Sequence, residues 1–261
     1  MSARHPDVGR KQMTVFTSDW RLRDIGKQIE ETRQLSYDKG PVFTPDTSIR
    51  EIVSTLHRGG GVALLSEGTW DFQDGYVMPD TTRSKITLMS VSPGNTVFRR
   101  TKTTSNPMLH MKGAEHRISG IRFHDDNATG PLVKFEGDRC SITNCVAEDC
   151  HSFVVVSGAS WCEVRGNHVI ETIAKGVEAT GTCAHLMIND NRFESAVRGD
   201  AIYLGDNVTS TTIMGNVLDY SGGTISVLGS AVGIPGVMAS SSYSLGLHNL
   251  NSVKHTNVTE R

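Results

Sequence analysis

A short pattern that recurs every 21 to 24 residues limits what this chain can fold into. Between Leu109 and Gly229, a strand-like apolar run ends five times at a glycine. These glycines are Gly137, Gly158, Gly181, Gly205 and Gly229. A repeat of this length without a helical period cannot bury its apolar residues alone, so successive copies must stack on one another.

Within each copy, apolar and polar residues alternate with a period of two, which is typical of a strand with one buried face. The apolar positions expected to face inward are Val133, Phe135, Val154, Val156, Val177, Ala179, Ile202, Leu204, Ile225 and Val227. The intervening segments are too short for the helices of a βαβ fold. The sequence therefore predicts an all-β protein, a single parallel β-helix that is right-handed because parallel crossovers nearly always are. A β-sandwich is the alternative.

An asparagine follows each of the first four glycines, at Asn144, Asn167, Asn191 and Asn216. Asparagine tolerates left-handed backbone angles, and stacked amides can hydrogen-bond along a solenoid axis. We expect these four residues to occupy equivalent turns of successive rungs.

Three segments are expected along the chain. Residues 1–40 form an arm with a helical part, in which Trp20, Leu22, Ile25 and Ile29 provide a narrow apolar stripe for attachment to another protein. Residues 41–229 form the β-helix, and a helix at 48–57 caps its N-terminal end. Residues 230–261 form an irregular C-terminal cap that also makes contacts within a trimer.

The N-terminal part of the predicted β-helix resembles a known family. The stretch TSIREIVSTLHRGGGVALLSEGTWDF and the later YVMP, KITLMS and GNTVFRR are similar to the start of pectate-lyase-like right-handed β-helix proteins. In that family an amphipathic helix caps the solenoid before the first rungs. The resemblance implies the fold, but the family includes polysaccharide lyases, glycoside hydrolases, epimerases and catalytically silent bacteriophage spikes.

Composition narrows the possible partners. A net charge of −2 gives no basic surface for nucleic acid, and no apolar run is long enough for membrane insertion. The first residues lack the apolar core of a secretion signal, which predicts synthesis in a host cytoplasm. The five cysteines match no zinc pattern and are expected to be reduced and buried. No metal site or other cofactor is predicted.

Candidate functional residues are sparse. Glu194, Arg198, Asp200 and Asp206 could approach one another around one rung and are the catalytic candidates. The outward positions Lys134, Glu136, Glu178 and Tyr203 are the candidates for ligand binding. No outward column holds the two acids that a glycoside hydrolase needs.

These features favour a structural or binding protein of a bacteriophage virion, a spike, fibre-like or decoration protein anchored through its N-terminal arm to other virion proteins. We expect a homotrimer held by residues 230–253 and by an outward apolar flank at Leu132 and Val155. A host surface glycan is a possible ligand. The alternative function is a polysaccharide-degrading enzyme, either a lyase or a glycoside hydrolase, of the depolymerase type.

Overall fold

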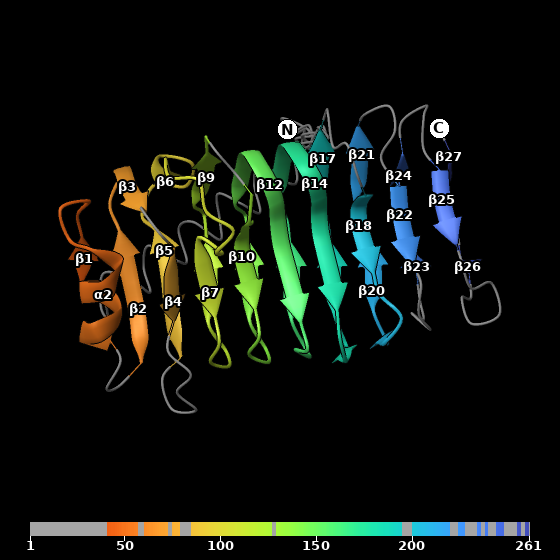
Figure 1. Ribbon diagram of the computed structural model, residues 1–261, viewed down its shortest axis with the longest axis horizontal. Coiled ribbons are helices and arrows are strands. Elements are labelled where there is room, and N and C mark those ends of the chain that lie inside the picture. Colours follow the sequence, from red (N-terminus) through yellow and green to blue (C-terminus); the bar gives the residue numbers. More distant parts are fainter. Residues whose placement is uncertain are drawn as a thin grey trace, which may run out of the picture. The chain divides into compact units, whose positions relative to one another are not determined.

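The computed structural model (Figure 1) describes residues 41–56, 60–72, 75–78, 85–126, 129–194 and 200–219, followed by the short strands β22 to β27. Side chains are described up to residue 218. Residues Gly40–Arg261 form one compact unit. The expected arm, with Trp20, Leu22, Ile25 and Ile29, lies outside the described residues, as do Arg198 and Leu228.

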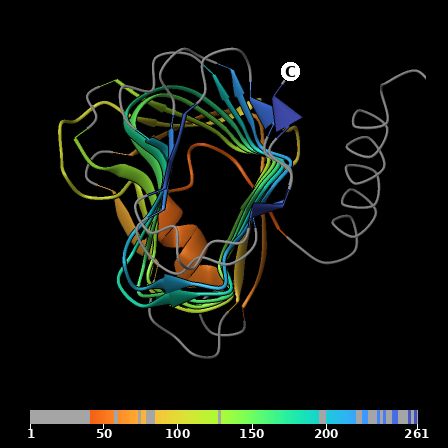
Figure 2. The ribbon, with the colours of Figure 1, turned by 90° about the vertical axis from the view of Figure 1, so that its right-hand side faces the viewer.

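The described strands pair in parallel and line the three walls of one solenoid, which Figure 2 shows end-on. Sheet one contains β1 (Val42–Phe43), β2 (Gly61–Leu65), β5 (Ile86–Ser90), β8 (Arg117–Ser119), β11 (Ser141–Thr143), β13 (Glu163–Arg165), β16 (Met187–Asn189) and β20 (Thr212–Met214). Sheet two contains β3 (Gly68–Phe72), β6 (Thr96–Arg100), β9 (Arg122–Asp125), the first halves of β12 (Val146–Ser157) and β14 (His168–Thr180), β17 (Arg192–Glu194), β21 (Val217–Asp219), β24 (Met238–Ala239) and β27 (Thr259–Glu260).

Sheet three is continuous with sheet two, because β12 and β14 bend through the corner between them. It contains β4 (Tyr76–Met78), β7 (Leu109–Met111), β10 (Pro131–Phe135), the second halves of β12 and β14, β18 (Asp200–Leu204), β22 (Thr224–Val227) and β25 (Ser244–Leu247). Two small pairs complete the strands: β15 (Cys183–Ala184) with β19 (Val208–Thr209), and β23 (Ile234–Pro235) with β26 (His255–Thr256). The predicted parallel β-helix is confirmed, and the sandwich alternative is excluded.

The predicted register is also confirmed. Val133 pairs with Val154, which pairs in turn with Val177, and the column continues to Ile202 and Ile225. The described inward side chains of this column are buried. Rings from sheet two fill the same interior, where Phe98 packs edge-on against Phe123. Burying large aromatic rings supplies much of the stabilisation of such a core.

Asparagines stack at the turn between sheets one and two, but in a register that differs at one position from the prediction. The amides of Asn167, Asn191 and Asn216 form a buried ladder, in which each Nδ2 of the first two lies 2.9 Å from the Oδ1 of the next asparagine. Asn144 is exposed and lies one position earlier, with a φ of 54°. Cys145 takes the equivalent ladder position, because its backbone N–H donates to Asn167 Oδ1 at 3.0 Å.

The helix expected at 48–57 is α2 (Ile49–Leu56), and its apolar residues Ile49, Ile52, Val53 and Leu56 are all buried. Its first turn is closed by a capping box. The Ser48 N–H donates to Glu51 Oε2 at 2.9 Å, and the Glu51 N–H donates to Ser48 Oγ at 3.2 Å. No helix among the described residues is long and apolar enough to span a bilayer.

One expected surface is instead core. Leu132 is fully buried, because it lies where the chain turns from sheet two into sheet three and faces the interior there, beside Phe153 on the next rung. Val155 does face outward, but it lies among polar residues. The apolar flank proposed as a trimer contact is therefore not formed by these two residues. Strand pairing also continues past Gly229, through β25 and β27.

All five cysteines, Cys140, Cys145, Cys150, Cys162 and Cys183, are free and buried, as expected. Burial raises the pKa of each thiol, to about 12 for Cys140, Cys145 and Cys162. A thiol with such a pKa stays protonated and is a poor nucleophile at neutral pH. These residues act as small apolar members of the core.

Candidate functional site

The outward side chains of sheet three form one polar row across adjacent rungs. In register, His110 on β7 is followed by Lys134 on β10, Val155 on β12, Glu178 on β14 and Tyr203 on β18. We call this row, together with Glu136 and Lys175, the Lys134 face. It contains all four residues that the sequence proposed for binding. His110 and Tyr203 are four strands apart, or roughly 19 Å, so the two ends of the row cannot act on one sugar ring.

At one end of the face, three side chains are bonded together. Lys134 Nζ lies 2.6 Å from Glu136 Oε1, and His110 Nε2 lies 3.0 Å from Glu136 Oε2. The Lys134 hydrogen bond keeps the pKa of Glu136 below its usual range. Burial lowers the pKa of His110 despite the nearby carboxylate, so its imidazole is neutral at pH 7. This group can hold a polar ligand through one cation and one neutral imidazole.

At the other end, a cation lies against an aromatic ring. Lys175 Nζ is 2.5 Å from Glu178 Oε1 and 3.9 Å from the centroid of the Tyr203 ring. The phenol hydroxyl can transfer a proton, and the ammonium can neutralise a ligand carboxylate. Lys175 and Tyr203 lie on neighbouring strands, so both can reach one sugar residue.

The proposed catalytic acids are not gathered into one site. Glu194 lies at the end of β17, where it contacts His168 Nε2 at 3.0 Å and Arg192 Nη2 at 2.5 Å. Asp200 begins β18, whereas Asp206 lies beyond its other end. The whole length of β18, roughly 13 Å from Asp200 to Leu204, lies between these two residues. Arg198 lies outside the described residues.

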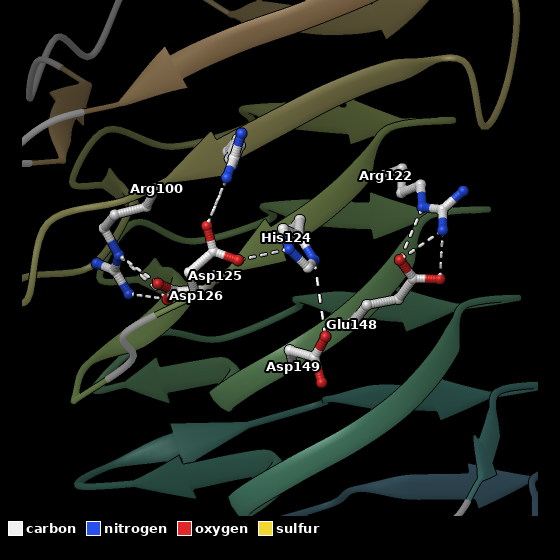
Figure 3. A network of polar contacts seen from close by, with 8 residues as sticks. Arg100, Arg122, His124, Asp125, Asp126, Glu148 and Asp149 are labelled. Atoms are coloured by element: carbon white, nitrogen blue, oxygen red, sulfur yellow. Dashed lines mark hydrogen bonds and ion pairs between the residues drawn. The ribbon is translucent and has the colours of Figure 1, made fainter.

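A second polar group, which sequence reasoning missed, lies where sheet two turns into sheet three. Figure 3 labels three of its members, His124, Asp126 and Asp149. We call it the corner cluster; it consists of Arg99, His124, Asp126, Asp149 and Glu171. Arg99 Nη2 lies 2.8 Å from Asp126 Oδ2, and this hydrogen bond lowers the pKa of Asp126. His124 Nε2 lies 2.7 Å from Asp126 Oδ1, and its Nδ1 lies 3.8 Å from Asp149 Oδ2.

Two carboxyls of the corner cluster interact directly. A hydrogen bond to Asp149, and the negative charge of Asp149, raise the pKa of Glu171. Both residues have left-handed backbones, with φ of 50° and 55°. Like charges on neighbouring rungs and left-handed backbone at residues other than glycine both cost stability. The 22-residue spacing of Asp149 and Glu171 matches the repeat, so comparison of corner positions across rungs could have found this pair.

Within the described part of the chain, no group of three His, Cys, Asp or Glu residues is arranged to hold a metal ion. In the corner cluster, Asp149 and Glu171 can share a proton. The Lys134 face instead offers groups that can bind an anionic or hydroxyl-rich ligand.

Comparison with known proteins identifies the family. The family described as the right handed beta helix region matches residues 85–238, more than half of the chain. The protein therefore belongs to the right-handed β-helix family. No curated protein sequence matches the chain.

Among solved structures, an alginate lyase from Paenibacillus sp. strain FPU-7 is similar, with a TM-score of 0.65 and 15% sequence identity over 81% of this chain and 82% of the lyase. The catalytic domain of a GH87 α-1,3-glucanase, solved with tetrasaccharides, gives a TM-score of 0.56 and 12% identity over 78% of this chain. This chain covers only 41% of that glucanase chain.

These comparisons overturn the expected virion protein. The alginate lyase and the glucanase are both polysaccharide-degrading enzymes, and they favour the alternative function that the sequence left open. The expectation of a virion protein rests on the sparseness of outward acids and on the arm. Neither feature distinguishes a spike from a polysaccharide-degrading enzyme.

Proposed function

We propose that this protein degrades polysaccharides, and more specifically that it is a lyase cleaving a uronate-containing polysaccharide on the Lys134 face. The observation that carries the proposal is the placement of Lys175 Nζ 3.9 Å from the Tyr203 ring centroid on an outward, accessible sheet. The similarity to an alginate lyase over most of both chains supports the same class of reaction.

A lyase of this kind breaks a glycosidic bond by elimination. A base removes the proton from the carbon next to the uronate carboxylate, and the electron pair forms a carbon–carbon double bond as the bond to the departing sugar oxygen breaks. That oxygen then takes up a proton. In this scheme the Tyr203 oxygen accepts the proton from the carbon while its own hydroxyl proton passes to the departing sugar oxygen, so the phenol is regenerated in the same step. The Lys175 ammonium stabilises the negative charge that builds up on the carboxylate. His110, Lys134 and Glu136 are about three strands away and bind a neighbouring part of the polysaccharide.

Glycoside hydrolysis at the corner cluster is a second candidate, because Asp149 raises the pKa of Glu171, which is the direction that a general acid requires. The short distance between the two carboxyls makes hydrolysis the weaker of the two candidate functions. The two carboxyls of a retaining glycosidase are about 5–5.5 Å apart, and inverting enzymes separate them further so that water fits between. A hydrogen-bonded pair such as Asp149 and Glu171 is closer than either arrangement allows.

Substitution of Tyr203 by phenylalanine tests the lyase proposal. The phenylalanine ring preserves the contact with Lys175 but removes the transferable proton. We expect kcat on a polyuronate such as alginate or polygalacturonate to fall about 100-fold or more, with little change in KM. Formation of the conjugated double bond, followed by ultraviolet absorbance, is the measurement.

Ser157→Ala is the matched control, since Ser157 lies on the outward side of β12 but outside both bonded groups. It should leave turnover unchanged. Full activity of Tyr203→Phe would refute the role given to the phenol. Release of reducing ends from a neutral glucan without a double bond, lost in Glu171→Gln, would establish the hydrolase instead.

A further inference from the structure

Sheet one, which carries none of the Lys134 face, bears a groove of its own. The groove has a volume of about 490 Å³, within the range of small-ligand sites. We name it the Trp161 groove after its largest exposed side chain, which is 54% exposed. Arg117, Ser141, Thr143, Glu163 and Met187 are among the outward residues that form its floor.

The indole of Trp161 is held in a fixed position. Glu115, Arg139, Trp161 and His185 occupy the same left-handed place in successive turns, with φ between 56° and 63°. The His185 imidazole stacks on the indole, with centroids 4.0 Å apart and planes tilted by 21°. Arg139 lies on the opposite side of Trp161, where its Nη1 is 3.5 Å from Glu115 Oε1, and both Arg139 and Trp161 line the groove. One aromatic face is therefore supported and the other borders the groove.

The groove floor supplies charge and hydroxyls. Arg117 is exposed, and among the described residues no carboxylate forms an ion pair with it. Ser141 lies in register between Arg117 on β8 and Glu163 on β13, and Thr143 lies two residues further along β11, between Ser119 and Arg165. Arg117 and Glu163 are two strands apart, or roughly 10 Å, which is comparable to the span of two linked sugar rings.

A rigid aromatic plane with one open face, an available guanidinium and a row of hydroxyls together match an acidic sugar chain. Aromatic faces pack against the apolar C–H face of a pyranose ring, and a guanidinium bonds a carboxylate through two parallel hydrogen bonds. We infer that the Trp161 groove is a second, non-catalytic binding site for a uronate-containing oligosaccharide, with one ring on Trp161 and a carboxylate on Arg117. The choice of an acidic sugar rests on the proposed function, but the site itself lies on a different sheet from the Lys134 face.

Calorimetric titration of the full chain with a defined oligomannuronate tests this inference. Trp161→Asn removes the platform, and asparagine tolerates the left-handed backbone that the position requires. We expect its affinity at this site to fall about tenfold or more, whereas Trp161→Phe retains most of it. Arg117→Ala should weaken binding about fivefold and flatten its dependence on salt. Met214→Ala is the control, since Met214 is an exposed residue of the same sheet that does not line the groove.

A parallel titration of Lys175→Ala separates this inference from the lyase proposal. If oligomannuronate binding persists in Lys175→Ala but is lost in Trp161→Asn, the groove is a site whether or not any polyuronate is cleaved. Unchanged affinity in Trp161→Asn overturns the inference. A neutral oligosaccharide that binds equally well, with Arg117→Ala unaffected, overturns the acidic ligand. Concentration-dependent dimerisation abolished by Trp161→Asn would assign the groove to a second copy of the chain instead.

Discussion

The side chains of Asn167, Asn191 and Asn216 satisfy backbone groups at the turn between sheets one and two. Asn191 Nδ2 donates to the Val164 carbonyl at 2.9 Å, and Asn191 Oδ1 accepts from the Asn167 N–H at 3.0 Å. Its Nδ2 also donates to the next amide of the ladder. Because the site is buried, each of these groups would lose a hydrogen bond that water cannot easily replace if the amide were removed.

Replacement of Asn191 by alanine should therefore destabilise the protein strongly. Several buried donors and acceptors lose their partners together, so we expect a loss of about 3 kcal/mol or more in the free energy of unfolding. Chemical denaturation measures it. Asn144→Ala is the control at the neighbouring turn position, where the side chain is exposed, and it should cost about 1 kcal/mol through the backbone alone. Equal losses in the two variants would contradict a structural role for the ladder.

The corner between sheets two and three depends on an ion pair that is buried completely. Arg100 on β6 and Asp125 on β9 are 0% and 1% exposed, and Arg100 Nε lies 3.1 Å from Asp125 Oδ2. The guanidinium also donates to the Asn106 and Gly130 carbonyls. It thus joins two strands to the segments that leave them, on the side of the solenoid where the corner cluster lies.

Asp125→Ala should cost about 3–5 kcal/mol, because it leaves a guanidinium charge buried without its carboxylate. The adjacent Asp126 provides a matched comparison. It also pairs with an arginine, Arg99, but both side chains are partly exposed, so Asp126→Ala should cost about 0–1 kcal/mol. Thermal unfolding of the two variants gives the comparison. If the two variants have similar melting temperatures, the buried pair does not hold this corner together.

Strands, and the side of each strand that faces inward, could be predicted from the sequence because both depend on a period of two. The inward column through Val133 and Val154 follows from alternation alone. Corners could not be predicted in the same way. At a corner the chain bends, as at the irregular pairing between Cys150 and Ser152, and the alternation is interrupted. For this reason alternation predicts the wrong side for Leu132. The recurrence of asparagine likewise places Asn144 one position out of register, because Cys145 takes the ladder position at that turn.

The candidate site was predictable only in part, for the same reason. Lys134, Glu178 and Tyr203 lie on strands, and their alignment follows from the repeat. Lys175 precedes the regular part of its strand, so its position against Tyr203 depends on the bend of β14. The pair of Asp149 and Glu171 lies entirely at corners, where no strand pattern applies.

The stability of the solenoid as a whole depends on its two ends, where core residues and strand edges would be exposed to water without a cover. At the N-terminal end α2 provides the cover, with Ile52 0% and Val53 1% exposed. Its main contacts are with β2 of sheet one and with β4, the first strand of sheet three. All of the described residues that cover the interior at this end come after Gly40 in the sequence.

A chain that begins at Gly40 should therefore melt within about 2 °C of the full chain, because it retains α2 and every buried residue described. Ile52→Asp in the full chain should instead lower the melting temperature by roughly 10 °C, since it places an unpaired carboxylate in the buried face of the cap. Circular dichroism at the strand minimum measures both, and Arg50→Ala on the exposed side of α2 is the control. A truncated chain that melts as low as Ile52→Asp would mean that residues 1–39 contribute to the stability of the solenoid, so that α2 is not a sufficient cap.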